Sequence, residues 1–232
     1  MDTPLHDSLD GQVALVTGAT RGIGRAIADD LVERGATVYA GARDPSDIDA
    51  DDREVVRLDV TDEAEIGRAV DRLRYEAERL DIVVNNAAVP GPAGPVGEAT
   101  TGGIDRVLQT NVRGPTLVTK HTLPLLLERD GGRVVNVSST GGQLSGEADR
   151  WRGIYSLSKA ALNGLTVQLD GAYADDGLLA NAASPGWTQT DLGGPEAPRT
   201  PEEGADTPAW LARFAPDAPS GLFWEDRAVI DW

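Results

Sequence analysis

Strand-like and helix-like segments alternate along this chain of 232 residues, and that alternation restricts the possible folds more than any other feature. Short apolar runs rich in Val, Ile and Ala are each followed by a longer segment whose apolar residues recur at helical spacing. Neighbouring parallel strands need a crossover connection, usually a helix, so this order predicts βαβ units. We expect strands at 11–18, 36–42, 53–60, 80–87, 131–139 and 178–186, an edge strand at 226–232, and helices at 21–35, 62–80, 103–129, 154–174 and 200–215.

The predicted fold is therefore α/β, with one doubly wound, mainly parallel sheet that is covered by helices on both faces. Neither a repeat nor a linker divides the sequence, so residues 1–232 are expected to form a single domain. Within it, residues 1–10 would be an N-terminal extension, and residues 187–232 would supply a helix and a tail on the substrate side.

Composition excludes several classes of protein. Hydrophobic residues make up 40% and charged residues 25%, as in globular proteins. The chain has no cysteine, which excludes disulfides, thiolate metal sites and a cysteine nucleophile, and no metal site is expected. A net charge of −17 disfavours nucleic acid and anionic membranes as partners. The sequence shows neither a signal peptide nor a membrane-spanning apolar run, so we expect a soluble, cytoplasmic protein.

The acidic excess is combined with a near absence of lysine, since only Lys120 and Lys159 are lysines among the 21 basic residues. One hypothesis is a protein adapted to a salty cytoplasm, where counterions screen the self-repulsion of the surface. The alternative is an acidic protein from a GC-rich genome that favours Arg codons.

A glycine-rich turn, TGATRGIG, joins the first predicted strand to the first helix and contains Gly18, Gly22 and Gly24. In Rossmann-type folds such a turn lets a pyrophosphate approach the backbone, and the helix N-terminus offers amide N–H groups to the anion. The spacing is G-x-x-x-G-x-G rather than G-x-G-x-x-G. Taken alone, the turn is also compatible with a purely structural role.

From this turn onward the chain resembles the short-chain dehydrogenase/reductase family, whose cofactor loop reads TGxxxGIG. The motifs LDV at 58–60, NNAA at 85–88 and PGWTQT at 185–190 follow in family order, although Ala88 replaces the usual glycine. The resemblance implies a Rossmann-type fold and a nicotinamide cofactor, with Asp59 at the adenine amino group. The cofactor residues it implies are Gly18, Thr20, Arg21, Gly22, Ile23, Gly24, Arg43, Asp59, Val60, Asn86, Ala87, Tyr155, Lys159, Pro185, Gly186, Thr188 and Thr190.

The end of the second strand bears on the choice of nicotinamide cofactor. A carboxylate there binds the ribose 2′-OH of NAD, whereas an arginine accommodates the 2′-phosphate of NADP. Arg43 occupies this position, and Arg21 in the glycine turn would form a second wall, as in NADPH-preferring relatives. We therefore expect NADP(H). The alternative is an NAD(H) site in which Asp44 binds the ribose and Arg43 is a solvated surface residue.

Tyr155 and Lys159 are four residues apart on a predicted helix, so their side chains project from the same face. A tyrosine exchanges its proton poorly at neutral pH, and a nearby ammonium group would lower its pKa. Arginine would serve less well because it does not release a proton. Lys120 has no such context and is expected to be a surface charge.

The family resemblance assigns two further catalytic residues. Ser139 would hydrogen-bond the substrate carbonyl oxygen, with Ser138 as the rival of the pair. The backbone carbonyl of Asn111 would hold a water molecule that connects Lys159 to solvent. Pro115 has no N–H to bond the carbonyl four residues earlier, so in a continuous helix the Asn111 carbonyl is left available.

The predicted reaction is reduction of a ketone or aldehyde to an alcohol, with a hydride from NADPH and a proton from Tyr155. One alternative is an NAD-dependent alcohol or sugar dehydrogenase. Another, of a different class, is a non-catalytic NADP(H) sensor on the same fold.

The segment between Ser139 and Tyr155 resembles the longer loop of the carbonyl reductase branch. It should border the substrate cleft. The aromatic residues Trp151, Trp187, Phe223 and Trp224 are candidates to line that cleft, and the alternative for each is ordinary packing. The partner is then a small carbonyl or alcohol compound. Relatives in this family are dimers, tetramers or monomers, so both a monomer and a homo-oligomer stay open.

Overall fold

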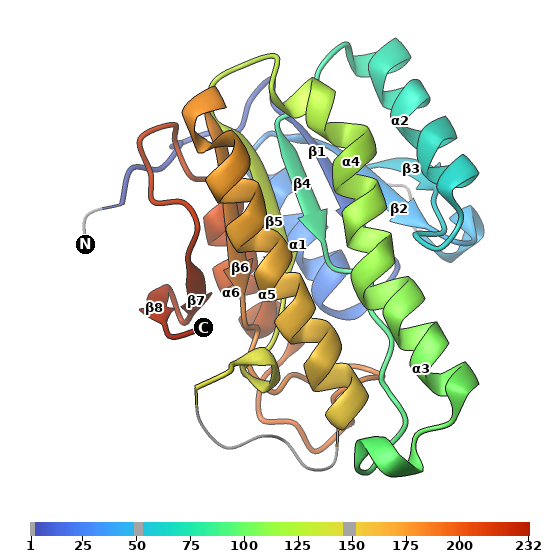
Figure 1. Ribbon diagram of the computed structural model, residues 1–232. Coiled ribbons are helices and arrows are strands. Elements are labelled where there is room, and N and C mark those ends of the chain that lie inside the picture. Colours follow the sequence, from blue (N-terminus) through green and yellow to red (C-terminus); the bar gives the residue numbers. More distant parts are fainter. Residues whose placement is uncertain (1–2, 49–52, 146–151) are drawn as a thin grey trace.

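The computed structural model describes residues 3–48, 53–145 and 152–232. Its centre is an eight-stranded sheet in the order β3-β2-β1-β4-β5-β6-β7-β8 (Figure 1). All neighbouring strands are parallel except β7 and β8, which form an antiparallel hairpin. The predicted α/β fold with a mainly parallel sheet is confirmed. The strands are β1 (Val13–Thr17), β2 (Thr37–Ala42), β3 (Glu54–Arg57), β4 (Ile82–Asn85), β5 (Gly132–Val137), β6 (Leu178–Ala183), β7 (Phe223–Glu225) and β8 (Ala228–Ile230).

Helices cover both faces of the sheet, as Figure 1 shows. Side chains alternate along β1, so Ala14 and Val16 join one apolar core while Val13 and Leu15 join the other. The first core includes residues of α1 (Gly22–Glu33) and α6 (Pro201–Ala212), and the second includes residues of α2 (Glu63–Ala77), α4 (Gly114–Leu126) and α5 (Gly153–Tyr173). Among the described residues, no helix is long and apolar enough to cross a membrane.

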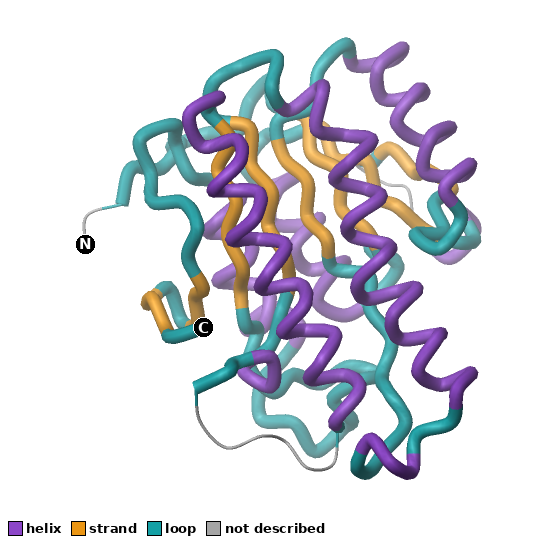
Figure 2. Tube along the Cα trace, in the orientation of Figure 1, coloured by secondary structure: helices purple, strands orange, loops and turns teal. Residues whose placement is uncertain are grey.

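The strand order reverses direction between β1 and β4. From β1 the chain adds strands outward to β2 and β3, and from β4 it adds them in the opposite direction. In open α/β sheets, a crevice for ligands lies outside the carboxyl ends of the strands at such a reversal. The loops at this edge are teal in Figure 2, below the strands.

The predicted helix at 103–129 is two α-helices separated by one π-helical turn. Helix α3 (Thr101–Leu108) passes through the π-helical residues Gln109–Arg113 into α4. Pro115 stands in the first turn of α4, directly after the π-helical turn. Gly114 allows a close approach, because a Cβ there would lie 2.9 Å from Val60 Cγ2.

The structure decides two questions about the C-terminal region. The sequence predicts the start of α6 from Thr200 and Glu203, and the structure confirms this capping box. Of the two roles left open for Phe223 and Trp224, cleft lining and ordinary packing, the structure shows packing. Both belong to β7, which the sequence analysis missed, and both are buried in the core, where Trp224 makes an edge-on contact with Trp210 at 5.2 Å.

Candidate active site

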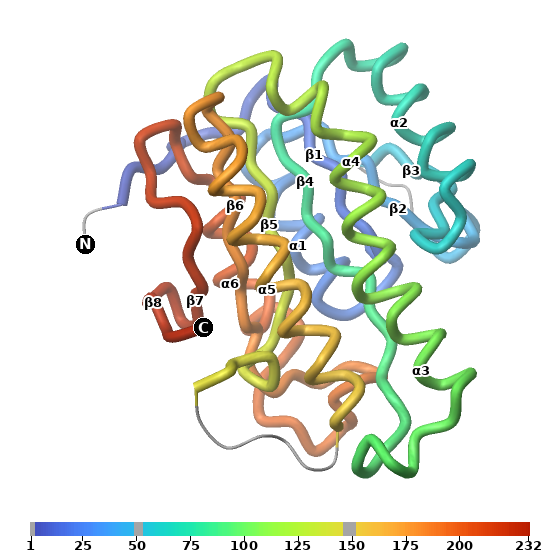
Figure 3. The backbone as a smooth tube through the Cα atoms, viewed as in Figure 1, coloured from blue at the N-terminus to red at the C-terminus, as the bar shows by residue number. Residues whose placement is uncertain are grey.

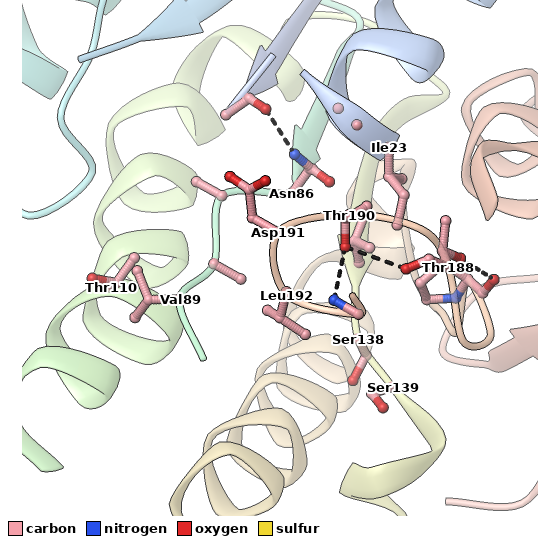
Figure 4. Close-up of a pocket in the computed structure, with 18 of the residues that line it drawn as sticks. Ile23, Asn86, Val89, Thr110, Ser138, Ser139, Thr188, Thr190, Asp191 and Leu192 are labelled. Atoms are coloured by element: carbon pink, nitrogen blue, oxygen red, sulfur yellow. Dashed lines mark hydrogen bonds between the residues drawn. The ribbon is translucent and has the colours of Figure 1, made fainter. Parts of the chain in front are cut away.

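A cavity of about 1350 Å³ lies at the carboxyl edge of the sheet, where the strand order reverses. It extends from the glycine turn after β1 to the loops after β5 and β6. Every residue that the sequence analysis assigned to the cofactor lines this cavity, and so does Ser139. Trp151 lies outside the described residues. Figure 4 shows part of the lining, with labelled residues Ile23, Asn86, Val89, Thr110, Ser138, Ser139, Thr188, Thr190, Asp191 and Leu192.

The glycine turn is closed by contacts that only glycine permits. Gly18 and Gly22 have φ of +65° and +56°, a conformation that side chains disfavour. A Cβ on Gly24 would lie 2.3 Å from both the Gly18 carbonyl oxygen and Asn86 Nδ2. Asn86 Nδ2 donates hydrogen bonds to the carbonyls of Thr17 (2.9 Å) and Gly18 (3.1 Å). Asn86 therefore holds the turn in shape from the end of β4.

The turn delivers the N-terminus of α1 to the cavity. Its N-cap is Arg21, which has an extended backbone and makes no side-chain capping hydrogen bond. The first amide N–H groups of the helix are therefore available to an anionic ligand, which the helix dipole also favours. This arrangement fits the pyrophosphate of a dinucleotide.

The expected adenine side of the cavity is preorganised by a short turn after β3. One carboxylate oxygen of Asp59 accepts hydrogen bonds from Thr61 N (2.9 Å) and Thr61 Oγ1 (2.7 Å). Val60 is buried beside it, against Gly114. The other oxygen of Asp59 has capacity for a donor such as an amino group.

Arg43 and Asp44, the two candidates for cofactor discrimination, differ in their surroundings. Arg43 is exposed and lines the cavity at the end of β2. The Asp44 carboxylate accepts hydrogen bonds from Ser46 N (3.1 Å) and Ser46 Oγ (2.8 Å), which lower its pKa. It thereby caps the 3₁₀ turn at Pro45–Asp47. Arg21, the expected second wall, forms an ion pair with Asp191 at 2.8 Å.

The expected catalytic groups meet at the opposite end of the cavity, where α5 passes the end of β5. Tyr155 and Lys159 are both buried on α5, and Lys159 Nζ donates to the Val137 carbonyl at 2.7 Å. The same ammonium lies 5.5 Å from the centroid of the Tyr155 ring. Ser139 follows β5, and its Oγ accepts from Gly141 N at 3.1 Å. Burial lowers the pKa of Lys159 to about 8.

The expectation that Lys159 lowers the pKa of Tyr155 is wrong for the protein by itself. Burial raises that pKa to about 12, because the phenolate would lose its hydration. The charge of Arg152 and hydrogen bonding to Ser139 act in the opposite direction. The phenol therefore keeps its proton at neutral pH.

The two serines after β5 have different surroundings. Ser138 is buried, and its hydroxyl donates to Asn163 Oδ1 at 2.5 Å and to the Lys159 carbonyl at 3.3 Å. These bonds tie β5 to α5. Ser139 is less buried and is the serine that interacts with Tyr155.

Asn111 lies in the π-helical turn, and its side chain is a structural link. Its amide exchanges two hydrogen bonds with the Val89 backbone, at 2.9 Å and 3.0 Å, and donates to Ser158 Oγ at 3.1 Å. The side chain thus joins the segment after β4 to α5, next to the Tyr155–Lys159 turn. The water-holding role of its backbone carbonyl stays a prediction.

Several residues at the catalytic end of the cavity escaped the sequence analysis. Arg152 is exposed there, three residues before Tyr155, and helical spacing was the only signal that pointed to it. Ser156 lines the cavity with a buried hydroxyl that has no partner within the described parts of the chain. Leu192 and Arg106 come from loop and helix positions that no motif marks. Trp187, which the sequence analysis did consider, lines the cavity and is 54% exposed.

With this geometry in hand, comparison with known proteins identifies the family. The family model for short chain dehydrogenases matches residues 12–200, most of the chain. The chain belongs to the short-chain dehydrogenase/reductase family. It is an NAD(P)-dependent oxidoreductase of that family, and acts on alcohol or carbonyl groups.

Its relatives in the short-chain dehydrogenase/reductase family include enzymes with different substrates. Carbonyl reductase (NADPH) 1 of Sus scrofa is 33% identical over 97% of this chain and 96% of that protein. Cis-4-hydroxycyclohexanecarboxylate dehydrogenase of Sinomonas cyclohexanicum is 38% identical over 78% of this chain and 75% of that protein. The crystal structure of a dehydrogenase/reductase from Sinorhizobium meliloti 1021 has a TM-score of 0.83 and 29% identity, covering 94% of each chain.

Proposed function

We propose that this protein is an NADP(H)-dependent carbonyl reductase that converts a ketone or aldehyde to an alcohol. The observation that carries the proposal is the meeting of Tyr155, Ser139 and Lys159 at one end of the cavity, with Lys159 Nζ 5.5 Å from the centroid of the Tyr155 ring. A phenol that is protonated at neutral pH can act as a general acid, and the neighbouring lysine and serine can resupply its proton and hold the carbonyl oxygen. The reductive direction requires this donor, so the site suits reduction of a carbonyl group.

Each side chain then has a defined task. Ser139 donates a hydrogen bond to the carbonyl oxygen of the substrate and holds it at the Tyr155 hydroxyl. Tyr155 donates its proton to that oxygen, and Lys159 returns a proton to Tyr155. The backbone carbonyl of Asn111 holds the water that resupplies Lys159. When bound, NADPH supplies the hydride.

The preference for NADPH rests on the end of β2. Arg43 is exposed at the cavity and is available for a 2′-phosphate, whereas the Asp44 carboxylate already accepts two hydrogen bonds from Ser46. In the alternative NAD site, the Asp44 carboxylate would bind the ribose, and it would then lose the hydrogen bonds by which it caps the 3₁₀ turn. The carbonyl reductase of Sus scrofa, similar over nearly the whole chain, carries NADPH in its name.

The substrate we propose is an apolar or aromatic carbonyl compound. Val89, Trp187 and Leu192 line the cavity along with the catalytic groups and offer apolar surface. Sites of this kind combine apolar walls with a few polar groups that fix orientation.

The deciding experiment measures NADPH consumption with ketones, aldehydes and quinones for wild type and Tyr155→Phe. We expect turnover to fall by about 10²–10⁴-fold in the variant, because the general acid is lost. NADPH affinity, measured by fluorescence, should stay within a few-fold of wild type. Tight NADPH binding by wild type with no turnover of any carbonyl compound would favour the sensor instead. Repeating the assay at molar KCl tests the hypothesis of a saline origin, which expects activity to rise.

Cofactor preference has its own test. Arg43→Ala should weaken NADPH binding by about tenfold, the loss of one charge-assisted contact to phosphate, and leave NADH binding unchanged. Arg68→Ala, an exposed arginine on α2, is the matched control for the loss of one positive charge. Unchanged NADPH affinity in Arg43→Ala would favour the NAD-dependent alcohol or sugar dehydrogenase.

A further inference from the structure

Arg199, just before α6, is hydrogen-bonded to the loop that follows β6. Its guanidinium binds Asp226 through two hydrogen bonds of 2.8 Å and donates a third, of 3.3 Å, to the Pro185 carbonyl. Its backbone carbonyl accepts from Gln189 N at 2.8 Å, and its N–H donates to the Trp187 carbonyl at 3.3 Å. A single residue thus contacts the start and the middle of a loop that lines the cavity.

The guanidinium packs directly on Gly186. A Cβ at this position would lie 2.7 Å from Arg199 Cζ, and φ of Gly186 is +69°. The glycine of the PG motif therefore has a second function here besides any contact with a cofactor. It makes room for the arginine that holds the loop.

Asp226, the partner of Arg199, lies in a tight hairpin turn. The turn joins β7 to β8, and Asp226 and Arg227 have φ of 50° and 58° there. Two successive positive φ values are typical of the type I′ hairpin turn. The hairpin is anchored at the sheet edge, since β7 pairs with β6 and Ser184 Oγ donates to Glu225 Oε1 at 2.9 Å.

The same C-terminal segment also reaches the loop that follows Ser139. The Trp232 backbone oxygen accepts from Leu144 N (3.2 Å) and Ser145 N (3.3 Å). The Trp232 ring stacks on Phe223 of β7 at 5.5 Å. Figure 3 shows the hairpin, in red, beside the yellow segment that comes after β5.

We propose that residues 223–232 form a brace that positions two loops at the mouth of the cavity, 185–193 and 140–145. Arg199 and Asp226 are positioning residues in this scheme. They set the loop that carries Thr188 and Thr190 against the cofactor, without touching the reacting atoms themselves. The effect on the substrate side rests on the proposed function, whereas the effect on nucleotide binding and on loop order does not.

The hairpin turn contains its own control. Arg227, next to Asp226, forms a comparable ion pair with Asp206, with one hydrogen bond of 2.9 Å from Nε and another from Nη2. This pair links the turn to α6 and, among the described residues, makes no hydrogen bond to the loop at 185–193, which Arg199 contacts directly. A contribution of the turn to stability alone would affect both pairs, whereas the brace requires only the Arg199–Asp226 pair.

The test compares wild type with Asp226→Asn, Arg199→Gln and Asp206→Asn. Asparagine tolerates positive φ, so Asp226→Asn removes the charge and keeps the turn. We expect backbone amide exchange in 185–193 to accelerate about fivefold and NADPH affinity to fall by a similar factor, as for loss of an exposed ion pair. Arg199→Gln should have the larger effect because its contacts to Pro185 and Gly186 are also lost. Asp206→Asn should change neither quantity.

For the second loop, Trp232→Ala keeps the backbone acceptor but removes the ring that stacks on Phe223, so exchange in 140–145 should accelerate and exchange in 185–193 should stay unchanged. The brace would be overturned if Asp226→Asn left exchange in 185–193 at the wild-type rate, or if Asp206→Asn accelerated it equally. Turnover is a separate measurement. If the wild-type protein reduces a carbonyl substrate, Asp226→Asn should raise the KM for NADPH and leave kcat within about twofold of wild type. A wild type without turnover would contradict the proposed reductase, and the exchange data would still decide on the brace.

Discussion

The nucleotide side and the substrate side of the cavity are built in different ways. On the nucleotide side, backbone approaches backbone, and Gly24 leaves only 2.3 Å between a hypothetical Cβ and the Gly18 carbonyl oxygen. On the substrate side, the loop after β6, which also carries the expected cofactor residues Thr188 and Thr190, is held by side-chain pairs such as Arg199 with Asp226, from positions far apart in sequence. The first kind of construction depends on a short local sequence. The second depends on long-range contacts between partly exposed groups, each of which contributes little by itself.

The largest expected effect separates the two serines after β5. Ser139→Ala should lower kcat by about 10²–10³-fold, as for loss of a hydrogen-bond donor to the reacting oxygen. Its free energy of unfolding should fall by no more than about 1 kcal/mol, for the lost hydrogen bond from Gly141 N. Ser138→Ala should instead destabilise the protein by about 1–3 kcal/mol, because Asn163 loses its buried partner. Steady-state kinetics and urea unfolding measure the two quantities.

Equal loss of kcat in both folded variants would contradict this division between a catalytic and a structural serine. Ser139→Thr is a useful further variant, since it retains a hydroxyl and should keep part of the activity.

The next effect concerns the buried lysine and its pH dependence. The pKa of Lys159 is lowered from 10.5 to about 8, so the unfolded chain holds this proton more tightly than the folded protein does. The charged lysine therefore destabilises the fold at pH 7, and this cost fades as pH rises from about 8 to about 10.5. The difference in free energy of unfolding between Lys159→Met and wild type should therefore favour the variant by about 3 kcal/mol more at pH 7 than it does at pH 11.

Urea unfolding of both proteins at pH 7, 9 and 11 measures this difference. Tyr155, with its pKa raised to about 12, titrates in both proteins and largely cancels in the comparison. A constant difference between the two proteins across that range would show that Lys159 is not desolvated as described.

A smaller effect tests the close packing of the nucleotide side. Gly24→Ala should lower the free energy of unfolding by about 2 kcal/mol, since the new methyl group meets a carbonyl oxygen that cannot move away. Gly67→Ala in α2 is the matched control, because nothing lies within 4 Å of its Cβ position. That control should gain up to about 1 kcal/mol from helix propensity. Thermal unfolding of the two variants gives the comparison, and stabilisation by both would contradict the packing argument.

The smallest effect tests the ion pair that spans the two sides of the cavity. Arg21 and Asp191 are both well exposed and lie 2.8 Å apart. If Arg21 helps to hold a 2′-phosphate, Asp191 competes for it, and Asp191→Asn should tighten NADPH binding by up to about fivefold at low salt. The gain should disappear at high salt, where exposed charges are screened. NADH binding is the control. An equal rise in NADH affinity would contradict a role of Arg21 in binding the 2′-phosphate.

Much of the fold was predictable because its signals are local. Apolar spacing located β1 and α1, and the Thr200–Glu203 capping box located the start of α6. The π-helical turn at Gln109–Arg113 was not predictable, since its residues suit an ordinary α-helix and the packing of Gly114 on Val60 is a tertiary contact. Strand β7 is three residues long, too short for a pattern to stand out, and it was missed for that reason.

The sequence by itself determined the family, the parallel sheet and many of the residues that line the cavity at the carboxyl edge. These properties reside in short motifs whose spacing follows from strand and helix periods, and in glycines that a tight turn requires. Only the tertiary structure decided that Ser138 bonds to Asn163, that Asp44 serves as a cap, and that Arg199 grips the loop after β6. It also reversed the expected direction of the Tyr155 pKa shift. Burial and long-range side-chain pairing set these features, and neither can be read from the spacing of residues along the chain.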